Sequence, residues 1–260
     1  MSDIIDYTEV PHLQEVLNYL PISPDDEEDV VSYIKNISNL IMVNYKYDQY
    51  QFAYFGIHLL YMIYIYCTAW KISRIEPVRY KDAIVFARAY SGREKDLKIE
   101  DADSIFAYSL MPEKDIARLF KIINLDRSHI LAVSDLVDTR NEMAHASGKF
   151  EILTEDIFEA KANSVIISMK NIQQCFDPFI RKWYKQVLIG FCAGDYEDYD
   201  NPNDFISEQM IQSFKLSTNE LLVCNGMSMK SLIEVHRDYK EKLKEFKKAM
   251  QLYCEKRGYV

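Results

Sequence analysis

Apolar residues recur every three or four positions over most of the chain, the spacing that places them on one face of an α-helix. The 260 residues include only 7 Gly and 7 Pro, too few for a sheet of many strands joined by turns. The pattern therefore predicts an all-α fold of long helices with short connections. The predicted helices cover residues 9–20, 25–45, 49–70, 77–90, 100–111, 112–124, 127–146, 154–192, 203–214 and 229–256.

One acidic stretch divides this pattern into two parts. Residues 195–204 contain five acids and no base, a composition typical of a solvated linker, and the stretch 194–202 is the best linker candidate. We therefore expect a helical bundle over residues 1–193 and a helical C-terminal appendage over residues 203–260. Pro178 lies inside the helix predicted over 154–192, where a proline is expected to kink or break the helix because it donates no backbone hydrogen bond.

The segment Gln49–Trp70 is a special case, because its 22 residues carry no formal charge and are long enough to span a bilayer. His58 is polar, and Tyr61 and Tyr64 lie near the middle of the segment, away from the membrane interfaces that tyrosine prefers. We therefore favour a buried central helix over a membrane span and expect no membrane partner. In that setting His58 is predicted to be a core residue with satisfied nitrogens.

Charge and cysteine usage narrow the class of protein. The formal net charge of −9 argues against broad wrapping of nucleic acid, which needs a basic surface, but allows a small site that binds one or two phosphates. The five cysteines are scattered, with no CxxC and no Cys/His pair at zinc spacing. The acidic N-terminus lacks the layout of an export signal. A cytoplasmic protein with reduced thiols, no metal and no cofactor is expected.

One arginine interrupts an otherwise apolar helix face. Ile130, Val133, Val137, Arg140 and Ala144 recur at three- and four-residue steps and form one stripe. A guanidinium keeps its charge at working pH, so Arg140 needs an anion or another acceptor there. One interpretation is a structural ion pair with a carboxylate of the bundle, and the other is a site that binds an external anion.

His145 lies in the last turn of the same predicted helix, where the negative end of the helix dipole favours the imidazolium form. Arg140 and His145 are about 500° apart around a helix, so their side chains point roughly 140° away from each other. On one straight helix they do not converge on one phosphate. Either the backbone turns at residues 146–148, or a second subunit supplies its own pair across a two-fold axis.

The run Arg140-Asn141, three further residues and His145, at the end of a helix in an all-α chain, resembles the RxxxxH signature of the HEPN superfamily. Many members of that family are dimeric ribonucleases of toxin–antitoxin, abortive-infection and CRISPR systems. The motif covers six residues, and the resemblance in architecture extends over roughly residues 50–190. Members paired with a nucleotidyltransferase antitoxin often carry a tyrosine two residues after the histidine, where this chain has Ser147.

The resemblance implies a metal-independent endoribonuclease without a cofactor. RNA carries its own nucleophile, the 2′-hydroxyl, so the protein needs only a proton shuttle and a positive clamp. His145 would act as general base or acid, Arg140 would stabilise charge on the phosphate, and Asn141 would orient the phosphate or the histidine. The implied setting is a homodimer in a prokaryotic antiphage or toxin system, with RNA as substrate and an antitoxin or other defence protein as partner.

Two rival functions remain open. The first is a HEPN-fold protein that binds or regulates without cutting, which suits the acidic charge and the basic segment 230–257, with nine bases and five acids. The second is a di-metal enzyme, because Glu142 and His145 form a Glu-x-x-His half-motif. The only other copy, Glu9 with His12, contains a proline in a short helix, which disfavours that enzyme.

A second candidate site mixes bases with aromatic residues. Arg181, Lys182 and Lys185 flank Trp183 and Tyr184, a combination that binds single-stranded RNA through phosphate contacts and base stacking. The alternative is an ordinary amphipathic helix surface.

Overall fold

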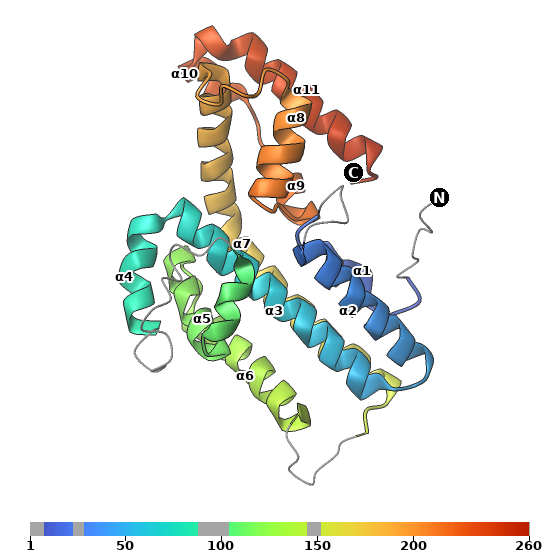
Figure 1. Ribbon diagram of the computed structural model, residues 1–260. Helices are drawn as coiled ribbons and strands as arrows, with labels where there is room; N and C mark the ends of the chain where they lie inside the picture. Colours follow the sequence, from blue (N-terminus) through green and yellow to red (C-terminus); the bar gives the residue numbers. More distant parts are fainter. Residues whose placement is uncertain (1–7, 23–28, 88–103, 145–151, 260) are drawn as a thin grey trace. The chain divides into compact units, whose positions relative to one another are not determined.

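The computed structural model describes residues 8–22, 29–87, 104–144 and 152–259. Within these ranges every regular element is a helix, apart from one isolated bridge between Pro21 and Ser217, so the fold is all-α as predicted (Figure 1). The chain forms two compact units. The first comprises residues 1–20 and 29–175, and the second comprises residues 21–28 and 176–260.

The first unit is built around one apolar helix, α3 (Tyr50–Ile75). Its length and composition would allow a membrane span, but 83% of its most apolar 18-residue window is buried. This burial is what the core helix of a soluble protein shows, as the sequence analysis expected. The helices around it are α1 (Leu13–Leu17), α2 (Asp29–Lys46), α4 (Pro77–Ala87), α5 (Glu113–Leu119), α6 (Arg127–Ala144) and the first half of α7 (Glu155–Ala193).

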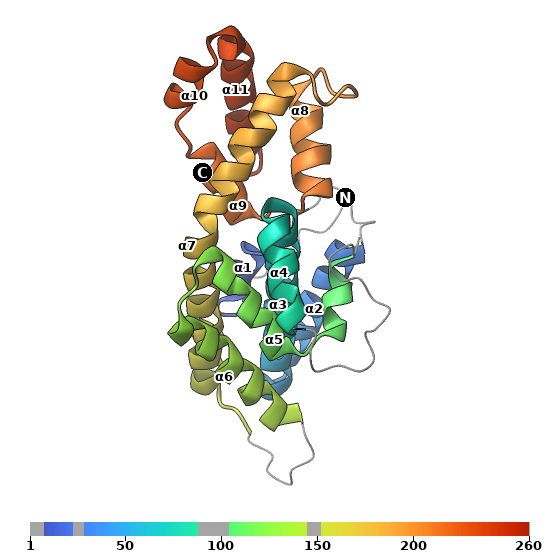
Figure 2. The same cartoon turned by 90° about the vertical axis from the view of Figure 1, so that its left-hand side faces the viewer.

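Close contacts fix α3 in place. Gly56 allows α2 to approach, because a Cβ at this position would lie 2.4 Å from Cγ1 of Ile41. Towards α7, the hydroxyls of Tyr61 and Ser168 lie 2.7 Å apart. The α5 and α6 helices pack against each other beside α3 (Figures 1 and 2), and a short 3-10 helix, Ile105–Leu110, precedes α5.

The second unit has an aromatic core. Phe205 and Phe246 are fully buried, and each packs its ring against Phe191 of α7. The α7 helix continues through Pro178 without the break that the sequence allowed. The remaining helices are α8 (Pro202–Phe205), the π-helical turn Ile206–Ser213, α9 (Thr218–Asn225), α10 (Lys230–Val235) and α11 (Lys240–Lys256).

The structure differs from the sequence analysis in three places of the second unit. The linker expected at 194–202 lies inside this unit, and the division between the units falls within α7, after Cys175. The single helix expected over 229–256 is interrupted at His236, whose φ of −114° and ψ of 66° are not helical. The α9 helix was not predicted, and a capping box between Ser217 and Glu220 begins it.

Candidate functional site

Arg140 lies near the C-terminal end of α6, on the face that carries the buried residues Val133 and Val137. Its Nη2 donates to both carboxylate oxygens of Glu113, the first residue of α5. The Arg140 side chain is 19% exposed and that of Glu113 is 24% exposed. The ion pair that the sequence left open as a structural role for this arginine is therefore present.

The guanidinium is not saturated by this pair. Its Nε atom is shielded from solvent and has no hydrogen-bond partner, and Nη1 makes no hydrogen bond with any residue that the structure describes. A guanidinium has five N–H donors. Glu113 therefore anchors Arg140 through one nitrogen and leaves donors on the other two.

A second ion pair fixes α6 against α5. Lys114, which follows Glu113, donates to Asp138 at 2.7 Å. An acid and a base that are neighbours on α5, Glu113 and Lys114, thus bind a base and an acid of α6 that lie two positions apart. The two pairs link neighbouring positions of the same two helices, so both favour the placement of Arg140 beside Glu113.

Close to Arg140, the core contains a histidine whose ring makes no hydrogen bond with the part of the chain that the structure describes. His58 is fully buried on α3, and neither ring nitrogen has a partner among the described residues. Burial lowers the pKa of His58 to about 3, and the positive charge of Arg140 adds to this shift. His58 is therefore neutral at physiological pH. Its predicted core position is confirmed, whereas the expected hydrogen-bond partners are not among the described residues.

The other two residues of the predicted catalytic motif have different outcomes. Asn141 is half-buried on α6 and makes no side-chain hydrogen bond with the described part of the chain. His145 lies outside the described residues, as do residues 146–148 at which a turn was considered. The structure thus brings Arg140 together with Glu113, and the pairing of Arg140 with His145 stays a prediction.

Sequence reasoning missed Glu113 and the link between His58 and Arg140. Glu113 follows Pro112 at a helix start, where an acid is ordinary, so its sequence position carries no sign of a distant partner. The only signal for His58 was a polar residue inside a charge-free apolar helix. Both contacts depend on how helices far apart in the sequence pack together.

The aromatic residues of the second candidate site are used inside the fold. Tyr184 is fully buried, and the ring of Trp183 stacks on that of Phe214, with centroids 3.8 Å apart and planes 12° apart. The bases Arg181, Lys182 and Lys185 are exposed on α7. The exposed part of the cluster is therefore basic rather than aromatic.

Candidate metal ligands do not gather in the described part of the chain. No group of three His, Cys, Asp or Glu side chains is close enough there to hold an ion. In the N-terminal half-motif, Nδ1 of His12 lies 3.8 Å from a carboxylate oxygen of Glu15. The five cysteines are free thiols.

No family model, curated protein or solved structure matches this chain.

Proposed function

We propose that the protein is a cytoplasmic, metal-independent endoribonuclease of the HEPN type whose active site is completed by a second copy of the chain. One observation carries the proposal: the guanidinium of Arg140 is anchored to Glu113 through Nη2, while Nε and Nη1 make no hydrogen bond with any described residue. A guanidinium anchored in this way is suited to a phosphate, because the N–H donors of Nη1 remain for a phosphate oxygen, whereas Nε is shielded from solvent.

In the proposed reaction, one His145 removes the proton of the RNA 2′-hydroxyl, and the 2′-oxygen attacks the adjacent phosphorus. The bond from phosphorus to the 5′-oxygen breaks, and the 5′-oxygen takes a proton from the His145 of the second copy. The products are a 2′,3′-cyclic phosphate and a 5′-hydroxyl. Arg140 stabilises negative charge on the phosphate oxygens, and Asn141 orients the phosphate or the imidazole.

Glu113 acts as a positioning residue in this scheme. Its carboxylate fixes the rotamer of a long side chain that otherwise has many conformations, which lowers the entropy lost when the phosphate binds. The pair also places a negative charge beside the phosphate site. Glu113 therefore improves the orientation of Arg140 and weakens its affinity for phosphate. Removing Glu113 is expected to loosen the orientation and to raise the affinity.

The test is incubation of the purified full chain with labelled single-stranded RNA and with DNA of the same sequence, in the presence of a chelator. We expect cleavage of RNA only, with 2′,3′-cyclic phosphate ends, and its loss in Arg140→Ala and His145→Ala. Arg127→Ala, on the first turn of the same helix, is the matched control and keeps activity. A chain that cuts equally well without Arg140 or His145 contradicts the proposal.

Light scattering tests the second copy. The proposed enzyme has the mass of two chains at the concentration at which it cuts RNA. A monomer that cleaves with full activity excludes the composite site.

A non-catalytic HEPN-fold protein that binds or regulates a partner is the second candidate, and the same ion pair favours it. A half-buried arginine held by both oxygens of a carboxylate on the neighbouring helix is also what a purely structural arginine looks like. This candidate predicts that RNA or a partner protein binds and that no RNA is cut. In that case Arg140→Ala changes stability alone.

A further inference from the structure

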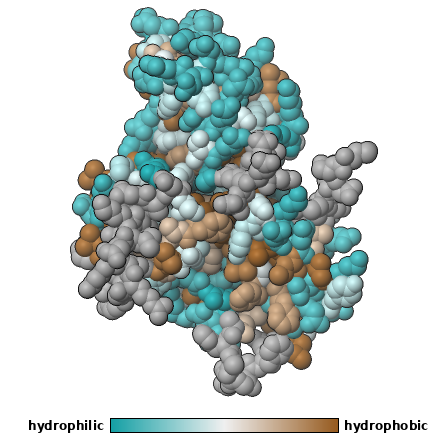
Figure 3. All heavy atoms as spheres, viewed as in Figure 1, coloured by the Kyte–Doolittle hydropathy of each residue, from teal (hydrophilic) through white to brown (hydrophobic). Residues whose placement is uncertain are grey.

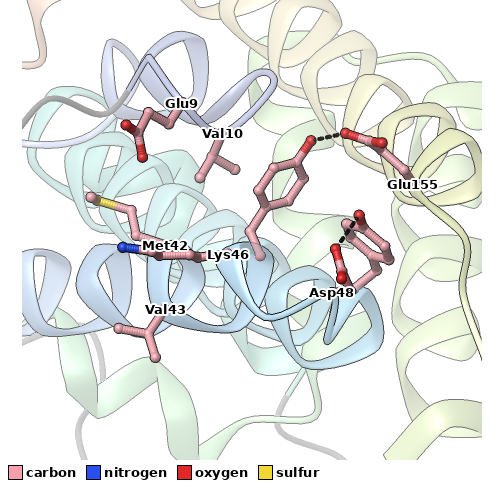
Figure 4. Close-up of a pocket in the computed structure, with 9 residues that line it drawn as sticks. Glu9, Val10, Met42, Val43, Lys46, Asp48 and Glu155 are labelled. Atoms are coloured by element: carbon pink, nitrogen blue, oxygen red, sulfur yellow. Dashed lines mark hydrogen bonds between the residues drawn. The ribbon is translucent and has the colours of Figure 1, made fainter.

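A pocket of about 550 Å³ opens on the first unit, where the end of α2 meets the starts of α3 and α7. Its size suits a small ligand or one long side chain. Figure 4 shows that the lining residues come from four segments of the chain. They are Glu9, Val10, Met42, Val43, Tyr45, Lys46, Asp48, Tyr50 and Glu155.

The pocket is negatively charged. Glu9, Asp48 and Glu155 contribute three carboxylates against one ammonium group, that of Lys46. None of these four residues forms an ion pair with another described residue. Lys46 extends towards Met42, away from Asp48 and Glu155 (Figure 4). The negative charge of this side is therefore not neutralised within the described chain.

Two tyrosines hold the carboxylates in position. The hydroxyl of Tyr45 donates to Glu155, and that of Tyr50 donates to Asp48 at 2.9 Å. The hydrogen bond to Asp48 raises the pKa of Tyr50 to about 12, so the phenol stays a neutral donor. The two rings meet edge to face, with centroids 5.3 Å apart. A carboxylate has about four lone-pair positions, so each can accept further hydrogen bonds.

An apolar surface adjoins the pocket. Leu40 and Val43 lie three residues apart on α2 and are 42% and 57% exposed, and Tyr47, in the turn directly after this helix, is 68% exposed. Phe52 at the start of α3 is 49% exposed. We call these four residues the apolar stripe. Val43 belongs to both the stripe and the pocket, and Figure 3 shows hydrophobic residues gathered over the α2 and α3 part of the first unit.

We propose that the pocket and the apolar stripe together dock a partner polypeptide that places an arginine in the pocket and apolar side chains on the stripe. The charge of the pocket calls for a cation. Arginine fits better than lysine, because its flat, weakly hydrated guanidinium binds carboxylates through paired N–H groups and packs on aromatic rings. The exposed stripe is what distinguishes a polypeptide from a free small cation, because isolated ammonium ions gain nothing from an apolar surface.

The experiment uses the full chain and two blocked peptides, one with a central arginine between leucines and one with citrulline, its neutral isostere, in that place. Binding is followed by the NMR signals of the Met42 methyl group and of the tyrosine rings. We expect the arginine peptide to bind about tenfold more tightly than the citrulline peptide. Asp48→Asn and Glu155→Gln should each remove most of that difference, because each removes one negative charge of the pocket. Both variants keep an acceptor oxygen for the tyrosine hydroxyls, so the pocket should keep its shape.

Matched controls separate the pocket from general charge and general hydrophobicity. Asp135→Asn changes the charge of the same unit at an exposed site on α6, and Leu131→Ser removes an apolar side chain that is 51% exposed. Neither should alter peptide binding, whereas Val43→Ser should weaken it severalfold. Equal binding of the arginine and citrulline peptides overturns the proposal, as does an equal effect of Asp135→Asn and Asp48→Asn.

Two further arms identify the source of the cation. If spermidine binds as tightly as the arginine peptide and Val43→Ser has no effect, the occupant is a free polyamine and the polypeptide is excluded. If light scattering shows self-association that Asp48→Asn abolishes, the occupant is a second copy of this chain rather than a different protein. Either result overturns the proposal, and neither depends on whether the chain cleaves RNA.

Discussion

Arg140 binds Glu113 through a single guanidinium nitrogen, Nη2, which donates to both oxygens of the carboxylate. The contact joins α6 to α5 and leaves two nitrogens of the same group without hydrogen bonds to the described residues. The structural role of Arg140 and its proposed chemical role therefore fall on one side chain. Measurements on this residue have to separate stability from activity.

A double substitution makes that separation. Arg140→Met leaves the half-buried carboxylate of Glu113 without its cation, so the free energy of unfolding should fall by about 1–2 kcal/mol. Adding Glu113→Gln removes the unpaired charge and should recover part of the loss. Urea unfolding measures both steps. RNA cleavage should stay absent in the double variant, and a stable double variant that still cuts RNA would exclude Arg140 from the chemistry.

His58 should make stability depend on pH. Its pKa is about 3 in the folded chain against an ordinary 6.5, so the unfolded chain takes up a proton first as the pH falls. Stability is highest above pH 6.5 and declines towards pH 3, with a loss of about 2 kcal/mol at pH 5 relative to pH 7.5 from this residue alone. Urea unfolding across this range should show that His58→Leu removes the loss.

His58→Leu should be at least as stable as the natural chain at pH 7.5, since an apolar side chain of similar volume replaces two nitrogens that have no partner among the described residues. His129→Gln removes a histidine that is only half-buried at the start of α6 and serves as the control. It should leave the pH dependence caused by His58 unchanged. Identical pH profiles for His58→Leu and the natural chain would contradict the prediction.

Gly56 should tolerate no side chain. In Gly56→Ala the new Cβ would lie 2.4 Å from Cγ1 of Ile41, so α2 has to move away from α3. Overpacking of this kind costs about 1–3 kcal/mol, against a gain of about 1 kcal/mol in helix propensity. Thermal unfolding should show a net loss of stability. The double variant Gly56→Ala with Ile41→Ala should lose less stability than the two single variants added together, because the clash with Cγ1 of Ile41 is then absent.

The basic residues near Arg181 should affect RNA binding, and the aromatic residues beside them should affect stability. Arg181→Ala with Lys185→Ala should change the free energy of unfolding by less than about 0.5 kcal/mol. RNA affinity should fall, and the slope of its logarithm against the logarithm of the salt concentration should become shallower by about one to two. Trp183→Ala should instead lower stability by about 2 kcal/mol, because the ring stacks on Phe214. Unfolding curves and RNA titrations at two salt concentrations give both results. Unchanged RNA affinity in the double variant would assign the bases to an ordinary helix surface.

The two longest helices were predictable for different reasons. The α7 helix follows from its apolar periodicity, whereas α3 is apolar on all sides and follows from its long stretch without charge. Both fall within a few residues of their predicted ranges at one end or both. The α9 helix has 8 residues, too few for a periodic pattern to stand out. Its only sequence signal is the Ser-x-x-Glu pair at Ser217 and Glu220, which begins a helix locally.

The candidate site was predictable only in part, for a physical reason. The need of Arg140 for an anionic partner follows from the apolar face around it, because a charge cannot be buried there alone. The identity of that partner, Glu113, depends on the packing of α5 against α6, which no local pattern encodes. The pocket that ends at Glu155 was missed for the same reason, since its lining comes from segments far apart in the sequence.

Pro21 and Ile22 belong to the second unit, where Pro21 forms a bridge with Ser217 and the amide of Ile22 donates to the carbonyl of Leu216 at 3.2 Å. A ribosome releases Pro21 and Ile22 long before Leu216 and Ser217. These contacts of the second unit therefore cannot form until residue 217 has been made. A fragment that begins at Phe176 lacks both contacts, so the same fragment should unfold at a higher temperature when residues 21 and 22 are supplied with it.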